Sequence, residues 1–186
     1  MAMVATANLP SAMRYTRPAV LLHWLLALMI LGSLSLGVYM SGLPVSPTRL
    51  KLYNWHKWAG VTILALSALR LLWRLTHKPP PDAAMPAWQA KAAHLTHGLL
   101  YALFFAVPLA GWAYSSSAGF PVVWFGVLQL PDFVPVDKAL AEVLKATHGN
   151  LAWALAGLVL LHVAGAIKHH FIDHDGLINR MRLGPR

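Results

Sequence analysis

The fold is decided by residues 145–168, KATHGNLAWALAGLVLLHVAGAIK, an apolar run with one histidine near each end. His148 and His162 are fourteen residues apart, nearly four whole turns of an α-helix, so they share one face. A rise of ~1.5 Å per residue separates them by ~21 Å along the axis, and the ~30 Å apolar core of a bilayer would enclose both. Two imidazoles at two depths on one stripe indicate two stacked sites, and each site needs a partner from another helix.

The composition is that of a membrane protein. Of the 186 residues, 58% are hydrophobic and 11% are charged, which is far from the usage of soluble domains. Lipid cannot satisfy an open strand edge, so spanning segments are helical. We therefore predict an all-α, integral membrane four-helix bundle in which residues 1–186 form a single membrane domain. The spans are expected at about residues 19–39, 58–75, 95–114 and 151–167.

The basic residues set the orientation of these spans. With four spans, both termini and the middle connection lie on one side, which we predict to be cytoplasmic because it carries the larger share of Lys and Arg. That side has Arg14, Arg17, Arg70, Arg74, Lys78, Lys91, Lys168, Arg180, Arg182 and Arg186, against Arg49, Lys51, Lys57, Lys138 and Lys145 opposite. Because these residues flank spans, the net charge of +9 predicts no binding to nucleic acid. No small-residue cleavage site follows the first apolar run, so we expect it to be retained as a helix.

Depth sorts four buried histidines into two pairs. His56 and His148 each lie at the outer start of a helix, and the two helices run in the same direction. His23 and His162 each lie six residues from a basic residue at the cytoplasmic edge, on helices of opposite direction. We therefore expect His56 to lie opposite His148, and His23 opposite His162.

Facing imidazoles inside a membrane suit haem iron, a transition metal or a proton relay, and such costly groups are functional by default. The chain has no cysteine, and its acidic residues lie outside the predicted spans, so zinc would lack two further ligands and a relay its carboxylate. Haem needs only two axial ligands. The residue four positions after each histidine is small, as a neighbouring macrocycle would require: Ala27, Gly60, Ala152 and Ala166. The alternative is a histidine-lined metal transporter without haem absorbance.

Other chemistry-bearing residues lie near the cytoplasmic ends. Arg70 and Arg74 share one helix face, where they either extend to the lipid headgroups or pair with haem propionates. His94 and His97 are expected at the membrane interface or beside a propionate. The remaining histidines are two at the membrane boundary and two on the solvated surface: His169, His170, His77 and His174.

Two further features concern the outer half of the bundle. Pro108 is expected to kink the third helix or to loosen one of its turns. The segment FPVVWFGVLQLP, residues 120–131, is too short and too interrupted to span, so we expect an interfacial element that caps the bundle.

An ordered set of motifs resembles the bacterial cytochrome b561 family. The set comprises HW at His23, R-x6-H-x3-G at Arg49, His56 and Gly60, RLLWR at Arg70 and Arg74, HLTH at His94, AVPLAG around Pro108, WFGVLQLP in the third loop, K-x2-H at Lys145 and His148, and H-x6-HH at His162. The resemblance covers the chain from about Tyr15 onward. It implies a multi-pass protein of the bacterial inner membrane with two b-type haems. In this family the periplasmic haem would be held by His56 and His148, and the cytoplasmic haem by His23 and His162.

The resemblance also implies a reaction. Short members of the family are similar to superoxide oxidases, which take electrons from periplasmic superoxide and deliver them to membrane ubiquinone. Since both axial positions of the iron are filled, we expect outer-sphere electron transfer. Arg49 and Lys145 are expected to steer superoxide, and His169 to contact quinone and donate a proton. The alternative, also found in this family, is a haem b subunit that links a partner dehydrogenase or hydrogenase to the quinone pool.

Overall fold

The computed structural model describes residues 14–183. Residues 1–13 and 184–186, which include the predicted flanking charge Arg186, lie outside this range. Its four long helices are α1 (Arg17–Ser41), α2 (Pro47–Thr76), α3 (Ala87–Ser117) and α4 (Lys138–Phe171). Two short strands, β1 (Val123–Trp124) and β2 (Leu128–Gln129), pair antiparallel between α3 and α4, and a 3-10 helix, η2 (Leu177–Met181), follows α4. The predicted all-helical architecture is confirmed, and each predicted span lies within one helix.

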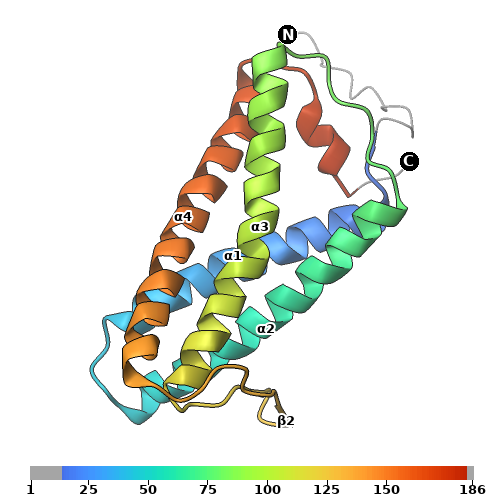
Figure 1. Cartoon of the computed structure of the whole chain (residues 1–186). Coiled ribbons are helices and arrows are strands. Elements are labelled where there is room, and N and C mark those ends of the chain that lie inside the picture. Colours follow the sequence, from blue (N-terminus) through green and yellow to red (C-terminus); the bar gives the residue numbers. More distant parts are fainter. Residues whose placement is uncertain (1–13, 184–186) are drawn as a thin grey trace.

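The helices form two neighbouring pairs, α1 with α2 and α3 with α4 (Figure 1). The pairs lie closest near the β-hairpin and diverge toward the opposite end, where η2 lies between them (Figure 1). We call these two ends the hairpin end and the terminal end. Both the first and the last described residues lie at the terminal end, where the backbone N–H of Tyr15 donates to the carbonyl of Arg180 at 3.3 Å.

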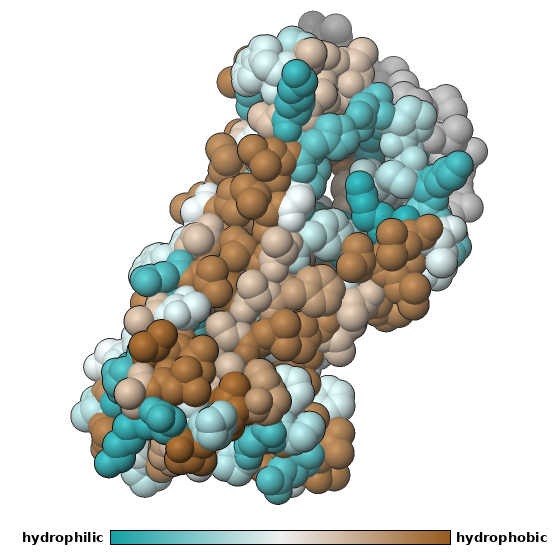
Figure 2. All heavy atoms as spheres, viewed as in Figure 1, coloured by the Kyte–Doolittle hydropathy of each residue, from teal (hydrophilic) through white to brown (hydrophobic). Residues whose placement is uncertain are grey.

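The surface between these two ends is apolar. Large side chains point outward from the helices, with exposed fractions of 69% for Leu28 and 71% for Leu160. In Figure 2 apolar residues cover the middle of the molecule, and hydrophilic residues gather toward both ends. All four helices are long and apolar enough to cross a membrane. A water-soluble monomer does not expose so much contiguous apolar surface, so the chain is a multi-pass membrane protein whose helices face lipid.

Local sequence explains where the helices begin. The Ser46 side chain accepts a hydrogen bond from the Arg49 backbone N–H at 3.2 Å, and Asp137 does the same for Leu140 at 2.9 Å. Such N-caps satisfy donors that the first helical turn leaves unpaired. The helix α3 continues without interruption through Pro108, where the sequence predicts a kink or a loosened turn.

The β-hairpin packs on α2 and closes the hairpin end. The indole N–H of Trp58 donates to the Val123 carbonyl at 2.6 Å, and that of Trp124 donates to the Thr62 hydroxyl at 3.2 Å. The Lys57 ammonium donates to the Phe120 carbonyl at 3.0 Å. Three side-chain bonds therefore hold the capping element against the half of α2 that lies nearest the hairpin.

The η2 segment ties the terminal end together. Arg180 is 8% exposed and donates from Nη1 to the Pro81 carbonyl, in the α2–α3 connection, at 2.6 Å. Trp24 on α1 donates its indole N–H to the Met181 carbonyl at 2.9 Å. Arg180, which sequence analysis treats as a flanking charge, is thus a buried structural contact.

Candidate cofactor sites

The histidine pair at the hairpin end consists of His56 on α2 and His148 on α4. Their ring centres lie 6.0 Å apart, with the ring planes inclined by 82°. His148 Nδ1 lies 3.0 Å from the Val107 carbonyl, and a carbonyl only accepts, so this nitrogen carries the proton. His56 Nδ1 lies within hydrogen-bond distance, 3.2 Å, of the Ser33 hydroxyl. Each ring therefore has its Nδ1 engaged, which leaves Nε2 as the nitrogen for a metal.

Two glycines make room for these rings. A Cβ at Gly37 on α1 would lie 3.2 Å from His56 Cε1, and a Cβ at Gly111 on α3 would lie 2.9 Å from His148 Cε1. The second distance is shorter than real Cβ contacts allow. The backbone of α1 at Gly37 thus lies close to the His56 ring, and the backbone of α3 at Gly111 lies close to the His148 ring. Both close approaches occur at a residue without a side chain.

The pair at the terminal end consists of His23 on α1 and His162 on α4. Their ring centres lie 6.1 Å apart, at an angle of 72°. A third ring, His97 on α3, has its centre 5.3 Å from that of His162. The Arg70 guanidinium is close enough to interact electrostatically with both His23 and His162.

The spacing of the pairs tests whether they fit haem. A metal-bound imidazole nitrogen lies about 2.0–2.1 Å from the ion and about 1.1 Å from its own ring centre, so two imidazoles on opposite sides of one ion have centres about 6.3 Å apart. The pairs His56/His148 and His23/His162 come close to this spacing. The His97/His162 spacing is shorter by about 1 Å. The residues present therefore fit haem in the predicted pairs, and their role as ligands stays a prediction.

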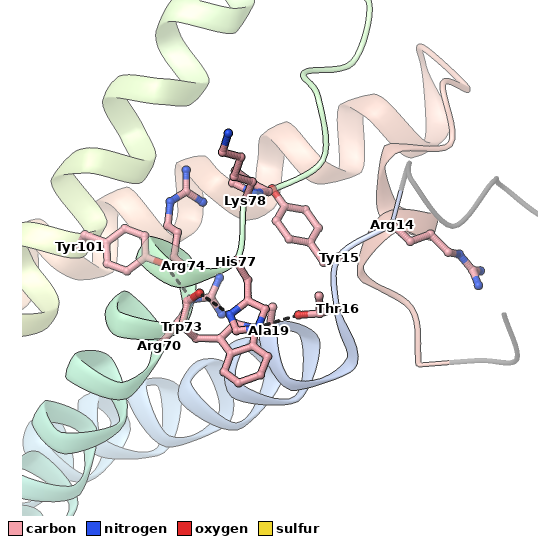
Figure 3. Close-up of a pocket in the computed structure, with 11 residues that line it drawn as sticks. Arg14, Tyr15, Thr16, Ala19, Arg70, Trp73, Arg74, His77, Lys78 and Tyr101 are labelled. Atoms are coloured by element: carbon pink, nitrogen blue, oxygen red, sulfur yellow. Dashed lines mark hydrogen bonds between the residues drawn. The ribbon is translucent and has the colours of Figure 1, made fainter.

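A basic pocket opens at the terminal end between α2, α3 and the start of α1 (Figure 3). Arg70 donates from Nε to the Tyr101 hydroxyl at 3.1 Å, and the guanidinium of Arg74 lies 5.9 Å from the centre of the same ring. The Arg70 Nη1 is buried and has no hydrogen-bond partner within residues 14–183. The remaining lining residues include further cations, Arg14 and Lys78, and no Asp or Glu lines the described pocket. The pocket is therefore positively charged and suited to bind carboxylate groups.

A second polar cluster surrounds His169 at the end of α4. Its Nδ1 lies 2.6 Å from Asp175 Oδ2 and 3.3 Å from Asp173 Oδ2. One imidazole and two carboxylates at these distances have the composition of a metal site. However, the Lys168 ammonium lies 2.5 Å from Asp173 Oδ2 and supplies a cation there already. We therefore interpret the cluster as an internal ion-pair network.

The other predicted residues lie apart from the paired histidines. His94 Nε2 is 2.9 Å from an Asp82 carboxylate oxygen on the surface, with 61% of the His94 side chain exposed. His77 stacks on Trp73, with ring centres 3.8 Å apart. At the hairpin end, Arg49 Nη2 donates to the Tyr53 hydroxyl at 3.2 Å, and its Nε is buried without a hydrogen bond to any described residue. Lys145 forms an exposed ion pair with Glu142 at 3.6 Å, while His170 and His174 are exposed.

The residues that support the paired rings were not predicted from the sequence. They are Ser33, Gly37, Val107, Gly111 and, in the basic pocket, Tyr101. The available signal was the set of small residues in GSLSLG, residues 32–37, and in AVPLAG, residues 106–111. An added Cβ at Gly60 would meet nothing within 4 Å, and the role of the small residues four positions after the histidines stays a prediction.

A lipid-facing helical bundle with two pairs of facing histidines defines a class, the haem-binding membrane cytochromes that transport electrons. The chain belongs to the prokaryotic cytochrome b561 family, which it matches over residues 14–184. Similar proteins include cytochrome b561 homolog 2 of Escherichia coli K12, 33% identical over 90% of both chains, and cytochrome b561 homolog 1 of the same organism, 31% identical over 90% of this chain and 96% of the other. A protein of Yersinia pestis named probable superoxide oxidase CybB is 29% identical over 86% of this chain and 90% of its own length.

Proposed function

We propose that this protein is a di-haem b-type cytochrome that transfers electrons from superoxide at the hairpin end to ubiquinone at the terminal end. The observation that carries the proposal is the presence of two histidine pairs of nearly equal ring spacing, 6.0 and 6.1 Å, one toward each end of one bundle. The relative named probable superoxide oxidase supports superoxide as the donor. The stoichiometry balances as two superoxide anions, one quinone and two protons giving two O₂ and one quinol.

The residues that would hold the two haems are His56 with His148 and His23 with His162. Haem, when bound, supplies one-electron redox chemistry. At the hairpin-end pair, the Nδ1 contacts orient the imidazoles of His56 and His148, and the glycines on α1 and α3 leave room for the two rings. The Arg70 and Arg74 guanidinium groups are proposed to bind propionates, because the buried Arg70 Nη1 otherwise lacks an acceptor in the described chain.

Side chains near the two ends of the bundle are proposed to attract superoxide at the hairpin end and to contact quinone at the terminal end. Arg49 lies seven residues before His56 and Lys145 three residues before His148, so both cations lie near the hairpin-end pair, where they would attract an anion. His169 lies seven residues, or two turns, beyond His162 and is proposed to contact the quinone. The positive-inside pattern favours a cytoplasmic terminal end and a periplasmic hairpin end in the bacterial inner membrane.

The test is superoxide-driven quinone reduction by the purified chain in nanodiscs that contain ubiquinone. We expect two haems per chain in the reduced-minus-oxidised spectrum, and quinol formation that superoxide dismutase abolishes. His148→Ala and His162→Ala should each remove one haem, whereas His94→Ala, a surface control, should retain both. A colourless protein would refute the proposal. A di-haem protein that reduces quinone only with a co-purified dehydrogenase or hydrogenase would establish the alternative, a haem subunit of a larger enzyme.

A further inference from the structure

His169 occupies a covered position at the end of α4, on the face that carries His162. Seven residues correspond to two turns, or about 10.5 Å along the axis, and leave the two side chains nearly aligned. The His169 side chain is 13% exposed. A histidine that only marks the membrane boundary would be exposed, as its neighbour His170 is.

Asp175 holds this imidazole in place. Its Oδ2 lies 2.6 Å from His169 Nδ1, and its Oδ1 accepts the backbone N–H of Leu177 at 2.9 Å. The Asp175 backbone N–H also points back to the His169 carbonyl, at 3.4 Å. The turn requires Gly176 in the left-handed region, with φ of 70°, which favours a residue without Cβ. The carboxylate is therefore itself fixed, with one oxygen directed at the ring.

This contact decides which nitrogen of His169 is free. An ionised carboxylate only accepts hydrogen bonds, so Nδ1 carries a hydrogen and Nε2 is the nitrogen that exchanges a proton with a ligand. Asp173 lies farther from the ring, at 3.3 Å, and pairs with Lys168. Asp173 is thus engaged mainly by Lys168, and Asp175 is the carboxylate that orients the His169 ring.

We propose that Asp175 is the positioning residue that makes His169 the proton donor for quinone reduction. This inference rests on the proposed function. In the step, protonated His169 gives its Nε2 proton to one carbonyl oxygen of the quinone as the electrons arrive from superoxide, and the N–H bond breaks as the O–H bond forms. Water supplies the second proton, to the other carbonyl oxygen. Asp175 stabilises the imidazolium beforehand and keeps the Nδ1–H afterwards. Water then restores the Nε2 proton of His169, whose own side chain is 13% exposed.

The first test compares Asp175→Asn with the matched variant Asp173→Asn in purified protein with both haems bound. Loss of a carboxylate that orients a metal-bound histidine typically costs 10- to 100-fold, and we take the same order of magnitude for the orientation of His169. We expect a decrease of this size in the maximal rate of quinone reduction by Asp175→Asn, with a smaller change in the quinone KM and an altered pH profile. Haem reduction by superoxide should stay at the wild-type rate. Asp173→Asn should change the maximal rate less than about threefold, and Asp175→Glu should recover part of it.

The second test measures which nitrogen of the His169 ring carries the hydrogen. Nitrogen NMR of ¹⁵N-histidine-labelled, reduced protein, with His169 assigned by comparison with His169→Ala, should show hydrogen on Nδ1 in wild type and a redistribution in Asp175→Asn. Equal rates for Asp175→Asn and Asp173→Asn, or an unchanged ring state, would overturn the inference. If wild type fails to reduce quinone at all, the proposed function falls, and the NMR spectrum still decides whether Asp175 fixes the ring.

Discussion

At the scale of single residues, Gly111 controls the position of His148. An added Cβ would lie 2.9 Å from Cε1 and 3.0 Å from Nδ1 of the imidazole, so the ring would have to move. The same ring donates from Nδ1 to Val107, one turn earlier on α3. A methyl group therefore disturbs both the position and the tautomer of the histidine.

We predict that Gly111→Ala lowers the haem content from two per chain toward one. Alanine is favoured over glycine in a helix by roughly 1 kcal/mol, so a loss of haem would not reflect a weaker helix. The measurement is haem per chain, with a spectrum that should match that of His148→Ala. Gly157→Ala on α4, where an added Cβ meets nothing within 4 Å, is the control and should keep both haems. Full haem content in Gly111→Ala would contradict the assignment of His148.

Arg70 offers a second prediction at this scale. Its guanidinium interacts electrostatically with His23 and His162, and a nearby positive charge favours the reduced, less positive form of haem iron. Arg70→Gln should lower the midpoint potential of the terminal-end haem by on the order of 50 mV, the equivalent of about 1 kcal/mol. Redox titration measures it. Lys91→Gln, on α3 and exposed, should leave the potential unchanged, and an equal shift of both haems would contradict the local effect.

The two histidine pairs could be predicted from sequence, but the shell around them could not. Distance from the basic edge of a span places a histidine at a depth, and only histidines of one depth can face each other. Ser33 and Gly37 come from α1, and Val107 and Gly111 from α3. Periodicity along one helix does not give the rotation or register of its neighbour, so these contacts require the structure.

At the scale of elements, the apolar stretches predicted the helices but not their ends. The first turns of α2 carry Arg49 and Lys51 and are capped by Ser46, so they are helical without being apolar. The cap over the bundle was predicted as an interfacial element, and its strands, β1 and β2, span only two residues each. Strands this short leave no alternating pattern. The η2 segment was not predicted, because its burial depends on Arg180 reaching the α2–α3 connection.

The hairpin gives a prediction at this scale. Removing the Trp124–Thr62 hydrogen bond with Trp124→Phe should lower the local free energy of hairpin opening by about 0.5–1.5 kcal/mol, the net contribution of one such bond. Thr62→Val should cost a similar amount, and the double variant should cost less than the sum of the two single variants. Hydrogen exchange of the Leu130 amide, which donates to Val122, measures the effect. Trp153→Phe, on the exposed face of α4, is the control, and additive effects would contradict the contact.

At the scale of the whole molecule, the two ends must lie on opposite sides of a membrane. The chain contains no cysteine, so single cysteines can be introduced without background. Val127→Cys at the hairpin and Ala84→Cys in the α2–α3 connection are both at exposed positions. We expect an impermeant maleimide to label Val127→Cys in intact spheroplasts, and Ala84→Cys only after the membrane is permeabilised. The reverse pattern would show that the predicted orientation, which rests on Lys and Arg counts, is wrong.

The helix α4 provides one histidine of each pair, and its partners come from two different helices, His56 on α2 and His23 on α1. A haem held between His56 and His148 would fix the position of α4 relative to α2. Because a helix is stiff along its axis, this would also fix the axial position of His162 at the terminal end. Binding of the first haem would order α4, so binding of the second would not lose that conformational entropy again. Cofactor loading should accordingly be cooperative, so that chains carrying a single porphyrin are rarer than independent binding would give.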